Sequence, residues 1–179
     1  MKNTDSYQSY IKSPYRSIKL TSYFHSYDYF FNKYRDKEIT FVEIGVLDGG
    51  PLFMWRDYFG EKARIIGVDL NPDAKQWEEH GFEIYVGDQS DKNFWGEFIN
   101  KVGKVDVVLD DGGHTYEQQI ITTECLLDSI NENGILLVED THTSYMSGFG
   151  PKNRSFIDYV KRKIDSVNSR FGKFVKGLA

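Results

Sequence analysis

The sequence predicts an α/β fold in which a doubly wound, mostly parallel sheet carries helices on both faces. Short apolar runs rich in β-branched residues alternate with segments of helical spacing along the chain. Runs such as 105–109 and 134–138 are nearly continuous in apolar residues, which is typical of parallel strands buried on both sides. Strand–helix alternation favours a parallel sheet with right-handed crossovers. A chain of 179 residues with 40% hydrophobic residues suits one domain with a full core.

The expected elements follow from local signals taken in chain order. Strands are expected at residues 39–44, 64–68, 82–86, 105–109 and 135–138. Helices are expected at residues 51–59, 73–80, 92–102, 115–130 and from 155 onward. Pro51 suits the first position of a helix, and Thr115 with Gln118 forms a capping box. The last helix has an apolar stripe at helical spacing, made of Phe156, Val160, Ile164, Val167 and Phe171.

Residues 1–37 form a separate polar segment, placed before a main domain at residues 38–179. The segment holds seven tyrosines, Tyr7, Tyr10, Tyr15, Tyr23, Tyr27, Tyr29 and Tyr34. Residues 21–34 suit an amphipathic helix, which could pack on the sheet edge or serve as a lid or a subunit contact. Together with an open sheet edge after the fifth strand, these aromatics favour a homo-oligomer.

Composition bounds the class of protein. The net charge of −5 argues against a nucleic-acid-binding surface. Cys125 is the single cysteine, so no internal disulfide can form and a reducing compartment fits. No apolar stretch approaches membrane-spanning length and the first residues lack a signal-peptide pattern, so we expect a cytoplasmic protein with no membrane partner.

Acidic residues follow two of the predicted strands. Asp110 and Asp111 come after the fourth strand, followed by two glycines and His114, and Glu139 and Asp140 come after the fifth. The carboxyl ends of parallel strands meet at the edge where open α/β sheets bind ligands. Because clustered carboxylates repel one another, a hard cation such as Mg²⁺ is the candidate to lie among them. His114 could act as a base beside that ion.

A glycine-rich loop, Gly45-Val46-Leu47-Asp48-Gly49-Gly50, connects the first strand to the first helix. Its spacing is not the G-x-G-x-x-G of dinucleotide-binding folds. Asp69 ends the second strand, where an acid can accept hydrogen bonds from ribose hydroxyls in enzymes that use NAD or S-adenosylmethionine (SAM) alike. Asp88, followed by Gln89, ends the third strand.

Five motifs carry a resemblance to a known family. They are Glu43–Val46, Met54–Phe59, Ile66–Asp69, Asp110–His114 and Glu139–Tyr145. The chain resembles class I SAM-dependent methyltransferases, which have a Rossmann-like fold, and more narrowly the metal-dependent sugar O-methyltransferases of the macrocin and mycinamicin group. The match covers roughly residues 39–170.

The resemblance implies a role for each candidate residue. SAM would be bound by Glu43, Gly45, Asp69, Asp88, Gln89 and Asp110. Mg²⁺ would be bound by Asp111, Glu139 and Asp140. His114 would be the general base that takes a proton from a hydroxyl of a small-molecule sugar or vicinal diol.

Two departures from the family pattern keep alternatives open. Family members commonly continue into two more strands that complete a seven-stranded sheet, and the printed sequence stops after the last predicted helix, as a truncated or a naturally shorter chain would. An auxiliary domain of some relatives is also missing. The alternatives are an NAD-dependent α/β oxidoreductase and a non-catalytic interaction module. The acceptor stays open among natural-product sugars, polysaccharide sugars and catechol-like diols.

Overall fold

The computed structural model describes residues 3–175, and side chains as far as residue 169. These residues form one parallel sheet of five strands in the order β3-β2-β1-β4-β5. The strands are β1 (Thr40–Ile44), β2 (Arg64–Asp69), β3 (Glu83–Val86), β4 (Val105–Asp110) and β5 (Ile130–Val138). The order reverses between β1 and β4, so the loops after these two strands lie at the switch point where such sheets bind ligands.

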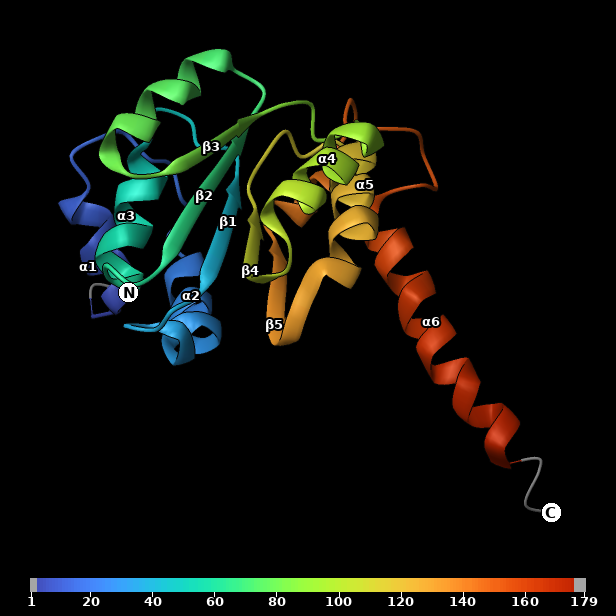
Figure 1. Ribbon diagram of the computed structural model, residues 1–179. Helices are drawn as coiled ribbons and strands as arrows, with labels where there is room; N and C mark the ends of the chain where they lie inside the picture. The colour runs from blue at the N-terminus through green and yellow to red at the C-terminus, as the bar shows by residue number, and fades with distance from the viewer. Residues whose placement is uncertain (1–2, 176–179) are drawn as a thin grey trace.

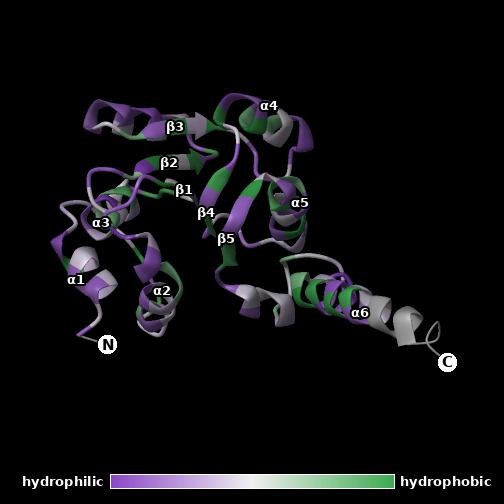
Figure 2. Ribbon diagram, turned by 60° about the horizontal axis from the view of Figure 1, so that its bottom comes forward, coloured by the Kyte–Doolittle hydropathy of each residue, from purple (hydrophilic) through white to green (hydrophobic). Residues whose placement is uncertain are grey.

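Helices cover both faces of the sheet, as the sequence predicts (Figures 1 and 2). One face carries α1 (Asp5–Lys12), α2 (Tyr23–Phe31) and α3 (Gly50–Phe59), and the other carries α4 (Lys92–Val102) and α5 (Tyr116–Leu126). Strand β1 divides its side chains between the two cores, since Phe41 packs in the first and Val42 and Ile44 in the second. Both cores are close-packed, so the strand ends are held rigidly.

Two predicted boundaries were wrong, and one predicted helix is of another type. Residues 72–80 form a 3₁₀ helix, η2 (Pro72–His80), which starts with proline and is capped by the side chain of Asn71. Helix α5 ends at Leu126 and not at 130, where a short 3₁₀ turn, η3 (Leu127–Ser129), leads into β5. Strand β5 starts at Ile130 and not at 135, because a register shift opposite β4 admits Asn133 in the left-handed conformation. The capping box of Thr115 and Gln118 is confirmed.

The segment before β1 packs against the main domain. Helix α2 buries Phe24, Tyr27 and Phe31 in the same core as Trp55 and Phe59 of α3. A 3₁₀ turn, η1 (Asn32–Tyr34), connects α2 to the residues before β1. The separate unit at residues 1–37, with its lid or subunit role, stays a prediction.

Strand β5 is the edge strand at the end of the sheet opposite β3. Beyond it, α6 (Phe156–Val175) projects away from the body (Figure 1). Among the side chains of the helix that the structure describes, residues 156–169, the buried ones are Phe156 and Tyr159 at its start. The stripe residues Ile164 and Val167 are 55% and 58% exposed, and the side chain of Phe171 lies outside the described residues. Within residues 3–175, no helix combines the length and apolarity needed to cross a bilayer.

Candidate active site

A pocket of about 600 Å³ opens at the carboxyl ends of the strands. All five strand ends contribute to its lining, which includes Gly45, Asp69, Asp88, Gln89, Asp111, His114 and Asp140. Three of the candidate residues, Glu43, Asp110 and Glu139, are buried and do not line the pocket. The structure therefore brings most of the candidate residues to one cavity and places these three behind it.

The turn after β1 depends on Gly45. Its φ of +85° is in the left-handed region, and a side chain there would overlap the carbonyl oxygen of Asp111. The turn is fixed by two further contacts, from Gly45 N to Val68 O at 2.8 Å and from Val46 N to the Asp69 carboxylate at 2.9 Å. The other Asp69 oxygen accepts the N–H of Asn71 at 2.9 Å. Asp69 thus holds two loops at the pocket wall.

The acids after β3 and β4 differ in their environments. Asp88 is exposed and accepts hydrogen bonds from the backbone and hydroxyl of Ser90, which lower the pKa of its carboxyl. Gln89 is buried and donates to Asp110 at 2.7 Å, while its amide oxygen accepts the N–H of Gly113 at 3.0 Å. Burial raises the pKa of Asp110 to about 6. Gln89 and Asp110 therefore support the turn that carries His114.

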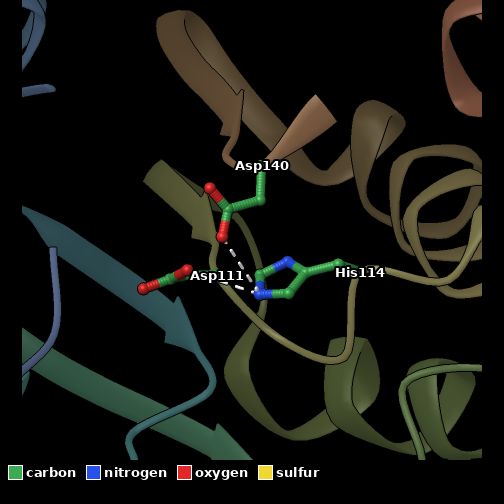
Figure 3. Close-up of side chains that lie close together, drawn as sticks. All are labelled: Asp111, His114 and Asp140. Carbon is green, nitrogen blue, oxygen red and sulfur yellow. Dashed lines mark ion pairs between the residues drawn. The ribbon is translucent and has the colours of Figure 1, made fainter. Parts of the chain in front are cut away.

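Asp111, His114 and Asp140 converge on one point of the pocket (Figure 3). The Nε2 atom of His114 lies 3.4 Å from Oδ2 of Asp140 and 3.8 Å from Oδ1 of Asp111. We call these two carboxylate oxygens the outer oxygens. One ligand atom from each of the three residues lies within 4.8 Å of the others, a spacing that suits a shared cation.

Both His114 and Asp140 adopt an unusual backbone conformation. Their φ values are +58° and +51°, in the left-handed region that side chains other than glycine, asparagine and aspartate rarely occupy. The hydroxyl of Thr143 donates to the carbonyl oxygen of His114 at 3.1 Å and so ties the two turns together. Non-glycine residues in this region are concentrated at functional sites.

The acidic cluster already contains one positive charge, which sequence reasoning missed. The ammonium of Lys19 is fully buried and lies 2.8 Å from Glu43, 2.7 Å from Oδ2 of Asp111 and 3.5 Å from Glu139. These carboxylates raise the pKa of Lys19 well above its ordinary value, against the opposing effect of burial. The chain thus supplies a cation of its own to one carboxylate within β1 and to those after β4 and β5.

Two tyrosines of α2 complete this network. Tyr27 donates its hydroxyl proton to Oε1 of Glu139. Tyr23 donates to Oδ1 of Asp140 at 2.8 Å, and its oxygen accepts the N–H of Asp140 at 3.2 Å. Burial and the contact with Asp140 raise the pKa of Tyr23 to about 12, so its hydroxyl stays protonated as a donor. The only signal in the sequence was the four-residue spacing of Lys19, Tyr23 and Tyr27.

The charge balance of the cluster favours a further cation. One ammonium faces three carboxylates, so negative charge is left in excess. Burial raises the pKa of Glu43 to about 7 and that of Glu139 to about 8, even with Lys19 beside them. The outer oxygens are the hard ligands that Mg²⁺ prefers, whereas imidazole is a less typical ligand for it. Asp111 and Asp140 therefore fit a magnesium ion, and Glu139 lies outside the three-residue group.

Comparison with known proteins gives consistent matches. Residues 42–141 match the family described as a methyltransferase domain. The chain is 31% identical over 160 residues to a tetracenomycin-C rhamnosyl 2'-O-methyltransferase of Streptomyces olivaceus, covering 83% of this chain and 42% of that protein. It is 34% identical over 154 residues to demethylmacrocin O-methyltransferase of Streptomyces fradiae, covering 79% of this chain and 38% of that protein.

A solved structure is similar over nearly the whole chain. The MycE methyltransferase of the mycinamycin biosynthetic pathway, in complex with Mg and SAH, superposes with a TM-score of 0.80 at 25% identity. The match covers 93% of this chain and 48% of MycE. The chain spans about two fifths of the length of the first two curated relatives.

Proposed function

The chain belongs to the class I SAM-dependent methyltransferases, in the group of the macrocin and mycinamicin sugar O-methyltransferases, and from this premise we propose that it methylates a hydroxyl of a sugar or other vicinal diol with the help of Mg²⁺. The observation that carries the proposal is the convergence of His114 with the outer oxygens of Asp111 and Asp140 at the pocket. Similar proteins support the acceptor class, since MycE is also known in complex with Mg, SAH and mycinamycin VI.

The cofactor part of the proposal places SAM in the pocket beside Asp69. A bound SAM would supply the methyl group of its sulfonium: the acceptor oxygen bonds to the methyl carbon as the carbon–sulfur bond breaks, and the neutral thioether leaves. Asp69 lines the pocket with its carboxylate already fixed by two backbone N–H groups, and each oxygen has a second lone pair for a ribose hydroxyl. Gly45 allows the ligand to approach the backbone closely. Glu43 and Asp110 act from below the surface by holding Lys19 and Gln89.

The acid–histidine part assigns the proton transfer to His114. Its Nε2 takes the proton of the acceptor hydroxyl, and the adjacent outer oxygens stabilise the imidazolium that forms. Within the described residues, its Nδ1 is buried without a hydrogen-bond partner, so no neighbour fixes the tautomer. Asp111 and Asp140 would hold Mg²⁺, with Glu139 behind them as a third candidate ligand, and the ion would supply the Lewis acidity that lowers the pKa of a hydroxyl.

Replacing Asp69 tests the cofactor assignment. Asp69→Ala removes hydrogen bonds between a carboxylate and ribose and should weaken SAM binding by about 1.5–3 kcal/mol, measured by calorimetry. Asp73→Ala, an exposed acid at the start of η2, is the matched control. NAD is titrated in parallel, and tight NAD binding without SAM binding would overturn the class of reaction.

Replacing His114 tests the base. His114→Ala should lower kcat about 10²-fold or more while SAM affinity stays unchanged, because the base acts on the acceptor. Turnover is measured over a panel of sugars and diols, with and without Mg²⁺, and chelation with EDTA should abolish it reversibly. Parental turnover in the variant would show that another group takes the proton, and full turnover in EDTA would remove the metal from the proposal.

A further inference from the structure

The outer oxygens of Asp111 and Asp140 point at His114 because the second oxygen of each carboxylate accepts a hydrogen bond on the opposite side. Asp111 uses Oδ2 to accept from Lys19 at 2.7 Å, and Asp140 uses Oδ1 to accept from Tyr23 at 2.8 Å. A carboxylate is planar, so fixing one oxygen fixes the direction of the other. Both holding groups come from the segment before β1, more than 90 residues away in sequence from the acids they hold.

Asp140 is the acid whose position depends most on such help. Its φ of +51° lies in the left-handed region, which aspartate adopts less readily than glycine does. The hydroxyl of Tyr23 contacts this residue twice, as a donor to Oδ1 and as an acceptor of its N–H at 3.2 Å. These two contacts fix both the backbone and the carboxylate plane of one residue.

Neither His142 nor the other two tyrosines of α2 contact Asp140 in this way. His142 places Nδ1 3.8 Å from Oδ1 of Asp140, too far for a hydrogen bond, and its side chain is 59% exposed. Tyr27, one turn further along α2, donates to Glu139 instead. Tyr29 on the same helix is 82% exposed. Tyr23 is therefore the residue that orients Asp140.

We propose that Tyr23 is a positioning residue, which aims the outer oxygen of Asp140 at the cation site beside His114. This inference rests on the proposed function in one respect, namely that Asp140 ligates a divalent cation. Groups that orient a metal ligand typically change metal affinity by about 10- to 100-fold when they are removed. Tyr23 is not among the residues that line the pocket with Asp69 and Gly45, so its effect should be confined to the metal.

The test is Tyr23→Phe, which deletes only the hydroxyl, with Tyr29→Phe on the exposed face of α2 as the matched control. Mn²⁺ serves as the probe for Mg²⁺, and free Mn²⁺ is counted by electron paramagnetic resonance, so that no acceptor is needed. Affinity for Mn²⁺ should fall about 10-fold in Tyr23→Phe and stay unchanged in Tyr29→Phe. SAM affinity without metal, measured by calorimetry, should change less than about twofold, because the cofactor contacts are untouched.

The outcomes separate this inference from the proposed function. Unchanged Mn²⁺ affinity in Tyr23→Phe, with parental protein that binds both SAM and Mn²⁺, overturns the role of Tyr23 alone. A parallel loss of Mn²⁺ affinity, SAM affinity and melting temperature would also overturn it, since Tyr23 would then act through packing. Parental protein that binds SAM but no Mn²⁺ overturns the metal part of both proposals. Parental protein that binds neither overturns the function itself.

Discussion

The segment before β1 and the helix α6 differ in how well the spacing of apolar residues in the sequence predicts which side chains are buried. The first segment has an irregular mixture of polar and aromatic residues, yet Phe24, Tyr27 and Phe31 are almost completely buried. Helix α6 has a regular apolar stripe, yet Ile164 and Val167 are more than half exposed. A periodic pattern therefore predicts that a helix forms, whereas burial depends on whether another surface lies opposite its stripe.

The partner surfaces explain this difference. Helix α2 lies against Trp55 and Phe59 of α3 and against Phe41 of β1, which together form an aromatic core. Helix α6 has its main contacts with α5 and with the 3₁₀ turn η4 (Thr141–Tyr145), and it then leaves the body (Figure 2). The first segment should therefore dominate both stability and the site, and α6 should contribute little to either.

Truncating a buried ring of α2 should have the largest effect. Phe31 is fully buried and packs against four other rings, so Phe31→Ala should lower the free energy of unfolding by about 3–5 kcal/mol. Urea unfolding followed by tryptophan fluorescence measures the change. A cost below about 1 kcal/mol would mean that the segment is only loosely attached, as a lid would be.

The dependence of stability on pH should come from the acids tied to Lys19. Glu43 has its pKa raised by burial from 4.5 to about 7, so the folded state binds the additional proton between these values. Stability should then fall as pH rises through this window, by an amount on the order of 2–3 kcal/mol. Glu43→Gln should remove this part of the slope in urea unfolding at pH 5 and pH 8.

An acid of α6 provides the control for that measurement. The hydrogen bond from Ser155 lowers the pKa of Asp158, so the stability it contributes is lost only as pH falls below its ordinary range. Asp158→Asn should leave the slope between pH 5 and pH 8 unchanged. An equal loss of slope in both variants would contradict the difference between the two regions.

The smallest effect is expected in the exposed part of α6. Ile164→Ser replaces a side chain that is 55% exposed, and the free energy of unfolding should change by less than about 0.5 kcal/mol. Urea unfolding at several protein concentrations measures this change. A large or concentration-dependent decrease in the free energy of unfolding would show that a second copy of the chain covers the stripe, in agreement with the predicted homo-oligomer.

The fold could be predicted from the sequence because its signals are local. All five strands are predicted, and all but β5, which starts at Ile130, agree to within one residue at each end. The acids at the ends of β4 and β5 are predicted to converge, as Asp111 and Asp140 do. Periodicity and turn residues act over short spans of chain, and the handedness of parallel crossovers then limits the topology. The capping box at Thr115 is the clearest case of a local signal that fixed a boundary.

The candidate site could be predicted only in part. The carboxylates were expected to need a positive charge, but only a metal was considered, and Lys19 was overlooked. Its contact with Glu139 joins residues 120 positions apart, and no local pattern encodes such a pairing. Two glycines precede His114, yet it is His114 itself that adopts the left-handed conformation. Tertiary contacts, such as that of Thr143, determine this choice.

The left-handed backbone at His114 and Asp140 has a consequence for how this site can change over generations. Glycine adopts that conformation without steric cost, so His114→Gly or Asp140→Gly should relieve about 1 kcal/mol of backbone strain. The same substitution would remove a side chain that the proposed reaction needs. A library selected for thermal stability alone would therefore accumulate glycine at these two positions. A lineage in which histidine and aspartate persist there must be under selection for what their side chains do.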